Sequence, residues 1–303
     1  MAMTTTAPQV QVTRSDNTLA GLVRSMRPRQ WVKNVLVLAA PFAGGTIFQL
    51  PVLAAVGIAF VAFSLAASGI YLVNDVQDIE ADRAHPAKRR RPIAAGVVSP
   101  RLALAAAVVL LLGAIGVSFL ASTGLVLVTS VYIAVQLAYC WWLKHQPVVD
   151  ICIVASGFLL RAIAGGAAAG IVLSQWFLLT TAFGSLFMVA GKRYAEIRLA
   201  ERTGAKIRKS LDRYTASYLR FVWTLSATGV IMTYGSWAFQ LSQTNHSRWP
   251  VISLVPFVIA VLRYAVDVDN GNGGEPEEIA LGDRVLQVLG ALLVLTLIAA
   301  VYL

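Results

Sequence analysis

Long apolar runs, separated by polar connections, limit the fold of this chain more than any other feature. A helix that crosses the ~30 Å hydrocarbon core of a bilayer needs about 20 consecutive apolar residues. Hydrophobic residues make up 57% of the sequence and charged residues only 13%, whereas soluble domains carry about 25% charged residues. The runs lie at residues 32–49, 52–73, 102–120, 122–142, 148–169, 174–190, 215–240, 249–266 and 285–303. We therefore expect an all-α membrane protein with nine transmembrane helices.

The positive charges predict how these helices are oriented. If successive runs cross the membrane in alternating directions, all of the 25 Lys and Arg residues except Arg161 and Arg248 fall on one side. Cytoplasmic connections retain Lys and Arg, so we expect the N-terminus in the cytoplasm and the C-terminus outside the cell membrane. Because topology accounts for the net charge of +10, no nucleic-acid partner is expected.

All 15 acidic residues also fall on the predicted cytoplasmic side. The positive-inside rule does not require this, because Asp and Glu contribute little to topology. Two long charged connections, 74–101 and 191–214, lie on that side as well. Long connections on one face commonly carry function, so we predict that the active site faces the cytoplasm.

The remaining sequence predicts a simple domain organisation. Residues 1–20 are polar and lack the apolar stretch of a signal peptide, so they are interpreted as a disordered tail. Residues 21–303 are expected to form a single integral-membrane catalytic domain. Cys140 and Cys152 have neither metal-site spacing nor a disulfide framework, which makes them packing residues.

The densest charge in the chain lies in the segment YLVNDVQDIEADRAHPAKRRRPIAAG, residues 71–96. Asn74, Asp78 and Asp82 are spaced to lie on one face of a helix, with Asp75 beside them. Like charges four residues apart repel on a helix, but a divalent cation reverses that effect. Mg²⁺ takes oxygen ligands from one or two carboxylates and from substrate phosphates. We predict that Asn74, Asp75, Asp78 and Asp82 form a Mg²⁺–pyrophosphate site, with Asn74 and Asp78 as the first choices for direct ligands. The alternative is a solvated acidic helix end.

Four consecutive cations, Lys88 to Arg91, follow the acidic residues. Arg binds phosphate oxygens through two parallel hydrogen bonds, and Lys binds them as a point charge. This order of charges suggests that the acids hold a metal, the metal holds a pyrophosphate and the bases hold its remaining charge. For Arg89 and Arg90, contact with anionic lipid is an equal alternative.

The segment NDVQDIEADRAHPAKRRRPIAAG resembles the first Asp-rich signature, N-D-x-x-D-x-x-x-D, of the UbiA superfamily of intramembrane prenyltransferases. Its P-x-K-x-x-R-P-I-x-x-G continuation is similar too and selects Lys88 and Arg91. The resemblance implies a helical bundle around a central cavity, with Mg²⁺-pyrophosphate at the cytoplasmic mouth. It implies that Asp75, Asp78, Asp82, Lys88 and Arg91 are catalytic. Tyr71, one turn earlier, is expected to face the same cavity.

The second motif departs from that family. Residues 191–214, GKRYAEIRLAERTGAKIRKSLDRY, lack a second D-x-x-x-D and begin instead with cations. This departure is similar to a branch that uses phosphoribosyl pyrophosphate (PRPP) as donor and a polyprenyl phosphate, such as decaprenyl phosphate, as acceptor for cell-wall arabinan synthesis. The resemblance implies that Lys192, Arg193 and Tyr194 contact the ribose 5-phosphate or pyrophosphate. Glu196 would orient Lys192 or a ribose hydroxyl. An ordinary basic loop is the alternative.

The stretch MRPRQWVKNVLVLAAP, residues 26–41, belongs to the same resemblance. Gln30, Lys33 and Asn34 begin the first apolar run at the membrane border and are expected to receive the lipid phosphate. Trp31 is expected to act as an interfacial anchor. For Lys33 and Trp31, plain membrane anchoring is the alternative.

Arg161 lies well inside an apolar run, where charge is costly and usually functional. We expect it to face the cavity and to pair with phosphate or with an acidic neighbour. Asp150 is a poor candidate for that neighbour, because eleven residues of helix rise about 16 Å.

The predicted reaction is attack of the lipid phosphate on the anomeric carbon of PRPP, with inversion and release of pyrophosphate. Two alternatives are prenyl transfer from a prenyl pyrophosphate to an aromatic or haem acceptor, and membrane transport. Transport is disfavoured because transporters place their sites near the midplane, whereas the charged motifs here cluster at one face. A homo-oligomer is compatible with the sequence.

Overall fold

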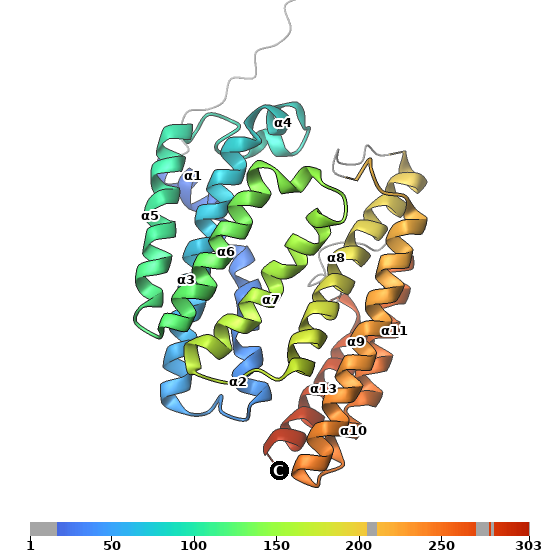
Figure 1. Ribbon diagram of the computed structural model, residues 1–303. Coiled ribbons are helices and arrows are strands. Elements are labelled where there is room, and N and C mark those ends of the chain that lie inside the picture. Colours follow the sequence, from blue (N-terminus) through green and yellow to red (C-terminus); the bar gives the residue numbers. More distant parts are fainter. Residues whose placement is uncertain (1–16, 205–210, 271–278, 280–281, 303) are drawn as a thin grey trace, which may run out of the picture.

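The computed structural model describes residues 17–204, 211–270, 279 and 282–302, and every regular element in those ranges is a helix (Figure 1). The long helices are α3 (Leu50–Gln77), α5 (Pro100–Ser118), α6 (Thr123–Trp141), α7 (Val149–Ala169), α8 (Gln175–Thr203), α9 (Ala216–Asn245), α11 (Leu254–Asp269) and α13 (Arg284–Tyr302). The short ones are α1 (Thr18–Ser25), α2 (Ala39–Ala43), α4 (Ile79–Ala84) and α10 (Trp249–Ile252), with 3₁₀ helices η1 (Pro28–Leu38), η2 (Lys88–Arg90) and η3 (Leu143–His145). The prediction of an all-α chain is confirmed. Residues 1–16 of the predicted tail lie outside the described residues.

Six helical units in the described part of the chain are long and apolar enough to cross a membrane. They are α3, α5, α6, α7, the α10–α11 unit Trp249–Asp269, and α13. Each corresponds to one of the nine predicted runs. The other three predicted runs, 32–49, 174–190 and 215–240, are not among these six units.

The prediction of one regular α-helix over 32–49 is wrong. The segment is the 3₁₀ helix η1 followed by the short α2, which ends at Gly44. Gly45 then adopts a positive φ of 69°, a conformation that glycine tolerates without cost. A 3₁₀ helix rises about 2.0 Å per residue, so the segment still runs from α1 to the opposite end of the bundle (Figure 1).

Helices α8 and α9 are long but less apolar because hydroxyl side chains interrupt them. Thr181 and Ser226 bond to backbone carbonyls four residues back, at 2.8 and 2.6 Å. The hydroxyls of Thr180 and Thr233 bond each other across the two helices at 3.1 Å. Hydroxyls satisfied in this way are common within packed membrane helices, so their presence lowers the mean hydropathy of α8 and α9 without leaving these polar groups unpaired.

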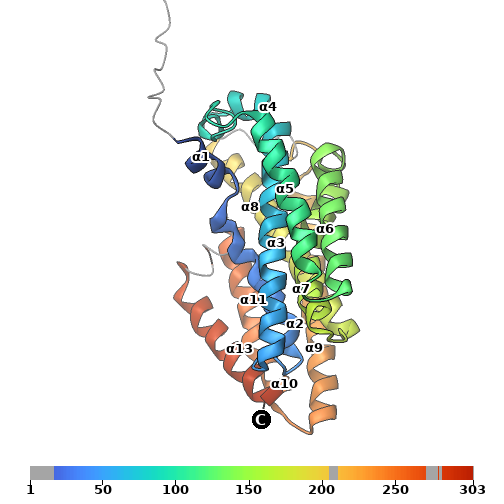
Figure 2. The ribbon, with the colours of Figure 1, turned by 90° about the vertical axis from the view of Figure 1, so that its left-hand side faces the viewer.

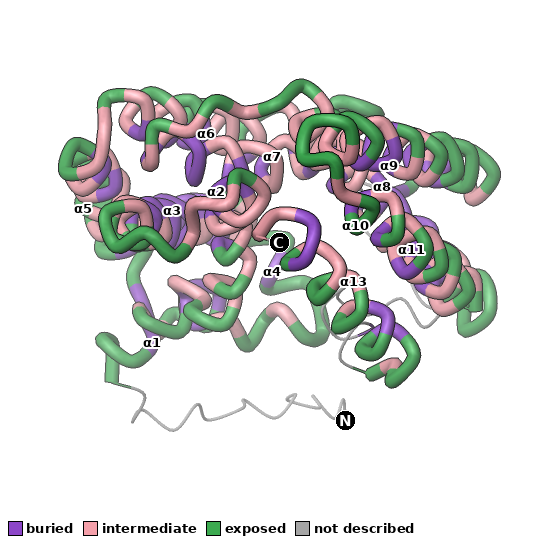
Figure 3. The backbone as a smooth tube through the Cα atoms, turned by 90° about the horizontal axis from the view of Figure 1, so that it is seen from below, coloured by how far each residue is buried: buried purple, intermediate pink, exposed green. Residues whose placement is uncertain are grey.

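The helices run roughly antiparallel, which collects the charged segments at one end of the bundle (Figures 1 and 2). Helix α4 and the end of α3 lie at that end, while α10 and the C-terminus lie at the other. The connections 44–49, 119–122, 170–174 and 246–253 at the α10 end contain a single Lys, Arg, Asp or Glu, Arg248. Seen along the bundle, exposed positions follow the outer flanks of α5 and α9, whereas α3 is buried along much of its length (Figure 3).

A glycine allows η1 to reach the middle of the bundle. A Cβ added to Gly165 of α7 would lie 1.8 Å from the carbonyl oxygen of Val37 in η1. No side chain fits at that distance, so the backbones of η1 and α7 are in direct contact. This contact places Asn34, which is fully buried, deep among the helices.

Buried apolar residues hold the charged connection after α4 against the end of α3. Ile93 and Val98 are at most 1% exposed and pack with Leu72, Ala103 and Cys140. Removing apolar surface from water stabilises a fold by about 25 cal/mol per Å². The burial of these side chains therefore holds the charged connection in place. The cationic segment therefore folds back onto the acidic one.

Candidate active site

The acidic cassette lies where α3 ends and α4 begins. Asp78 separates the two helices with φ −96° and ψ 10°, outside helical geometry. Its backbone N–H still bonds the carbonyl of Asn74 at 3.0 Å, and that of Asp82 bonds the carbonyl of Asp78 at 2.8 Å. Asn74 and Asp78 share a helical face as expected, because their side chains bond at 3.2 Å. Asp82 lies beyond the interruption at Asp78 and shares Arg91 with Asp75 instead. The break sorts the cassette into two pairs.

The first pair is Asp75 and Asp82, which are each only 2% exposed. Arg91 bridges them, with Nη1 3.1 Å from Asp75 Oδ1 and 2.7 Å from Asp82 Oδ2. Buried carboxylates are tolerated only when they are paired and hydrogen-bonded. Arg91, expected to face the leaving pyrophosphate, is therefore also the group that holds these two acids together.

A second cation, Arg27, reaches the same carboxylate. Its Nη2 lies 2.5 Å from Asp75 Oδ1, and its guanidinium lies 4.7 Å above the ring of Tyr71. Arg27 has a left-handed backbone, with φ 54°, at the junction of α1 and η1. Sequence reasoning counted Arg27 only as a topological charge. Tyr71 was expected at the cavity, and the structure places it beneath this cation.

The second pair is Asn74 and Asp78. The Asn74 amide donates to Asp78 Oδ2 at 3.2 Å, and the Nζ of Lys144 lies 2.6 Å from Asp78 Oδ1. Lys144 comes from η3, in the connection between α6 and α7. It was missed because a lone cation in a short connection has no distinguishing pattern.

This second pair fits the chemistry of a magnesium site. Among the described residues, no group of three or more His, Cys, Asp or Glu converges as a metal cluster. Mg²⁺ does not need one, since one or two carboxylates combine with substrate phosphates and water. Asn74 offers an amide oxygen and Asp78 a carboxylate oxygen, and the two side chains are in contact. The Asp78 side chain is 32% exposed, so it is more accessible than the buried Asp75 and Asp82.

The four consecutive cations are not equivalent. Arg91 is turned inward as described, Lys88 is half-buried, and Arg89 and Arg90 are exposed. His85 Nδ1 accepts the backbone N–H of Lys88 at 3.3 Å, which fixes the turn before η2. The exposure of Arg89 and Arg90 suits a role at a charged membrane surface better than a role inside a site.

The second motif divides between two neighbours. Arg193 forms an ion pair with the buried Asp150 of α7, and the hydroxyl of Tyr214 donates to the same carboxylate at 2.5 Å. Burial raises the pKa of Tyr214, and the bond to Asp150 raises it further. Arg193, expected to contact phosphate, is therefore engaged with a carboxylate that sequence reasoning left aside.

Tyr194 points away from the cassette. It is 2% exposed, its hydroxyl donates to Asp269 of α11 at 2.8 Å, and its ring stacks on Trp223 at 5.4 Å. In this structure it fastens α8 to α9 and α11. Lys192 and Glu196, one turn apart on α8, are both half-buried.

Arg161 is enclosed by neutral groups. Its Nε donates to Asn34 Oδ1 at 2.7 Å, Nη1 to the Gly157 carbonyl at 2.6 Å and Nη2 to the Tyr132 hydroxyl at 3.0 Å. Its guanidinium also lies 5.7 Å from the Phe158 ring. The expected acidic partner is absent from the contacts of the described residues. Carbonyl and hydroxyl oxygens replace it, so the charge is satisfied without a counter-ion.

The start of the first run also differs from expectation. Asn34 is fully buried against Arg161 and Ser64, so its side chain is enclosed by protein and is not open to a lipid phosphate in this structure. The indole of Trp31 donates to Ser68 of α3 at 3.1 Å, which makes it a link between η1 and α3. Gln30 and Lys33 are half-buried, and their expected role at the membrane border stays a prediction.

The connection between α6 and α7 joins the two motifs. Lys144, which holds Asp78, and Asp150, which holds Arg193, both line one pocket of about 300 Å³. His145, Gln146, Pro147, Asp212 and Arg213 complete its lining. In Figure 1 this connection lies between α4 and the upper end of α8. The second motif thus contributes Asp212 and Arg213 to this charged hollow, and Lys144 links the hollow to Asp78 of the first motif.

Comparisons with known proteins show which family and which enzymes this chain resembles. The UbiA prenyltransferase family matches residues 35–281. Decaprenyl-phosphate phosphoribosyltransferase of Mycolicibacterium smegmatis is 59% identical over 298 residues, covering 94% of each chain. The Mycobacterium tuberculosis protein of that name, strain H37Rv, is 62% identical over 289 residues, covering 94% of this chain and 95% of its own. A UbiA homologue from Archaeoglobus fulgidus, solved with DMAPP and Mg²⁺, superposes with a TM-score of 0.71 at 14% identity, over 93% of this chain and 99% of its own.

Proposed function

The chain belongs to the UbiA prenyltransferase family, and from this premise we propose that it transfers the 5-phosphoribosyl group of PRPP to decaprenyl phosphate. The observation that carries the proposal is 59% and 62% identity, across 94% of this chain, to two enzymes named for that activity. Such similarity extends over both charged motifs and the helices between them. The product is a cell-wall arabinan precursor.

The chemical step is a substitution at the anomeric carbon of PRPP. A phosphate oxygen of the lipid forms a bond to that carbon while the bond to the pyrophosphate oxygen breaks, and pyrophosphate leaves with the bonding electrons. The attacking phosphate is already anionic, so no strong general base is required. In-line attack predicts inversion. The protein contributes by positioning the reactants and by stabilising the charge on the leaving group.

Asn74 and Asp78 would hold a magnesium ion, which when bound neutralises charge on the departing pyrophosphate. The contact between their side chains and the exposure of Asp78 support this assignment. Lys88 is proposed to bind pyrophosphate oxygens. Lys144, whose Nζ lies 2.6 Å from Asp78, is close enough to act on the same group.

The buried acids Asp75 and Asp82, together with the half-buried Arg27 and Arg91, act as a frame for that site. Their bonds fix the end of α3 to α4 and to η1, so the exposed groups are held before substrate arrives. Lys192 and Arg193 are proposed for the ribose 5-phosphate, with Glu196 orienting Lys192. The opening of the charged hollow beside Asp150 supports this placement.

The lipid phosphate is proposed to bind near Gln30 and Lys33, where η1 begins at the charged end of the bundle. The same end is proposed to face the cytoplasm, with nine segments crossing the membrane when η1–α2, α8 and α9 are included. The single charged residue in the four connections at the α10 end, Arg248, supports that orientation.

Donor choice tests the function directly. Purified protein in lipid nanodiscs with Mg²⁺ should transfer label from ribose-labelled PRPP to decaprenyl phosphate. It should transfer none from labelled prenyl pyrophosphate to an aromatic acceptor. Transfer only from the prenyl pyrophosphate would replace the proposal with ordinary prenyl transfer.

A further inference from the structure

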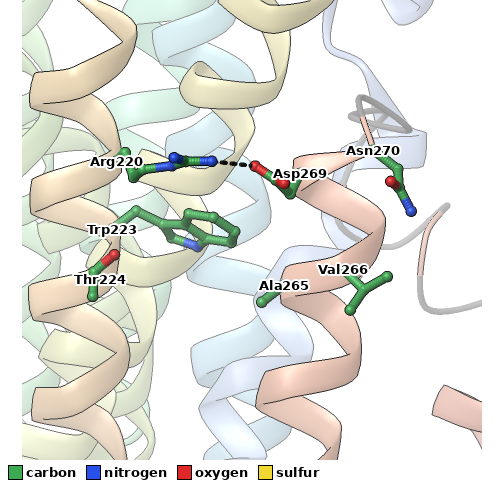
Figure 4. A pocket seen from close by; sticks show the side chains of 7 residues that line it. All are labelled: Arg220, Trp223, Thr224, Ala265, Val266, Asp269 and Asn270. Carbon is green, nitrogen blue, oxygen red and sulfur yellow. Dashed lines mark hydrogen bonds and ion pairs between the residues drawn. The ribbon is translucent and has the colours of Figure 1, made fainter.

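A second polar pocket lies between α9 and α11, on the opposite half of the bundle from α3 and α4 (Figures 1 and 4). Its volume is about 330 Å³, within the range of sites that bind small molecules or headgroups. Arg220, Trp223 and Thr224 contribute from α9, and Ala265, Asp269 and Asn270 from the end of α11. None of these residues belongs to the proposed active site.

The surroundings place this pocket at the border between acyl chains and headgroups. Asp269 is the last residue of a helix long and apolar enough to span a membrane. Toward the middle of the bundle, the same two helices expose large apolar side chains: Leu225 is 53% exposed and Leu262 59% exposed. Such side chains face lipid tails, so the pocket opens at the level of the lipid phosphates.

The charged side chains of the pocket form an ion pair. Arg220 Nη2 lies 2.9 Å from Asp269 Oδ1, and the two side chains are 58% and 49% exposed. Tyr194 donates to the same Oδ1 at 2.8 Å, which leaves Asp269 Oδ2 for another donor. A guanidinium carries five N–H donors, so Arg220 can bind a further anion without releasing Asp269.

The floor of the pocket carries an unused donor. Trp223 is 7% exposed, and its indole N–H has no hydrogen-bond partner among the described residues. Buried polar groups nearly always have a partner. That N–H lies against Gly191 of α8, where an added Cβ would be 2.9 Å from it, so it faces away from the opening and plays no part in selecting the ligand.

We propose that this pocket binds the headgroup of a zwitterionic phospholipid, phosphatidylethanolamine. Its phosphate pairs with Arg220 and its primary ammonium with Asp269, so both charges of the protein pair meet an opposite charge. A phosphate alone would face the Asp269 carboxylate. A choline headgroup has no N–H to donate to Asp269 Oδ2, and a glycerol headgroup has no positive charge.

This site is coupled to the second motif through one bond. Asp269 holds Tyr194, and Tyr194 is one residue from Arg193 on α8. A headgroup bound to Asp269 therefore restricts the motion of the turn of α8 that carries the proposed phosphate ligands, acting through Tyr194.

Native mass spectrometry of the whole protein tests the site. Protein from nanodiscs that contain equal amounts of phosphatidylethanolamine, phosphatidylglycerol and phosphatidylcholine should retain one phosphatidylethanolamine, at least tenfold over the other two. Arg220→Gln and Asp269→Asn should each reduce that retention about tenfold. Ala265→Leu, which fills the pocket and keeps both charges, should reduce it equally. Arg101→Gln, an exposed Arg at the same end of the bundle, should leave retention unchanged.

Several results would overturn the site. Equal retention of phosphatidylethanolamine in wild type and Ala265→Leu would place the lipid elsewhere. Equal retention of all three phospholipids would remove the headgroup selectivity. Displacement of the lipid by inorganic phosphate, or preference for decaprenyl phosphate, would identify a phosphate site without a requirement for ammonium. Far-ultraviolet circular dichroism of each variant separates loss of lipid from loss of fold.

Discussion

Arg27 donates a 2.5 Å hydrogen bond to Asp75 across 48 residues of sequence. Asp75 is almost fully buried, and Arg27 is the cation that ties the entry of η1 to the end of α3. Arg27→Gln should lower the free energy of unfolding by about 1.5–3 kcal/mol, the range for bonds to charged groups. It should also slow transfer at least tenfold. Arg29→Gln changes an exposed neighbour and should alter neither the free energy of unfolding nor the transfer rate. Equal effects from both variants would mean that the total positive charge at this end matters and the Arg27–Asp75 bond does not.

The enclosure of Arg161 predicts coupling with Asn34. Their hydrogen bond is 2.7 Å long and joins two buried side chains. Each single variant, Arg161→Met or Asn34→Ala, therefore leaves a buried polar partner without its hydrogen bond. The double variant should be less destabilised than the sum of the singles by about 1–2 kcal/mol. Denaturation of the four proteins in detergent measures this. Strict additivity would show that the two side chains act independently.

The contact of η1 with α7 predicts a size limit at Gly165. A methyl group there would lie 1.8 Å from the Val37 carbonyl oxygen, so Gly165→Ala should force the backbones apart and cost about 1–3 kcal/mol. At Gly57 of α3 an added Cβ would meet nothing within 4 Å. Gly57→Ala should therefore be neutral or stabilising by up to ~1 kcal/mol. Comparable melting temperatures for the two variants would refute the close approach.

The apolar pattern and the order of charges predict much of this molecule, but not its long-range pairings. The runs predict the helices because burial in lipid dictates both their length and composition. The run at 32–49 is not one α-helix because Pro41 has no N–H to bond the Val37 carbonyl and α2 ends at Gly44, although the composition stays apolar throughout. Spacing within the cassette cannot reveal a break of the helix axis at Asp78.

The partners of the cassette lie beyond the reach of a local pattern. Arg27 and Lys144 are 48 and 66 residues from the acids they hold, and single cations carry no signal of their target. The position of Arg161 within an apolar run predicts a special environment but does not identify its partners. Its neutral partners, Asn34 and Tyr132, become visible only when η1 and α6 pack against α7.

The Tyr214–Asp150 bond predicts a dependence of stability on alkaline pH. Burial, then the bond to Asp150, raises the pKa of Tyr214 in the folded state above the unfolded value of about 10. The unfolded chain therefore loses this proton first. The stabilisation is fully present below pH ~10 and declines as pH rises from there toward the folded pKa. The stability advantage of wild type over Tyr214→Phe should be constant from pH 7 to 9 and shrink by pH 11; a constant difference throughout would contradict the raised pKa.

Asp78 provides the sharpest test of the catalytic assignment. Purified wild type, given PRPP, Mg²⁺ and decaprenyl phosphate, should yield a lipid whose mass rises by one phosphoribosyl group, and Asp78→Ala should yield at most about 1% of it, a loss of roughly 3 kcal/mol of transition-state stabilisation. Glu80→Ala removes an exposed acid two residues away and should retain wild-type yield. Full product from Asp78→Ala, or no phosphoribosylated lipid from wild type, would contradict the account.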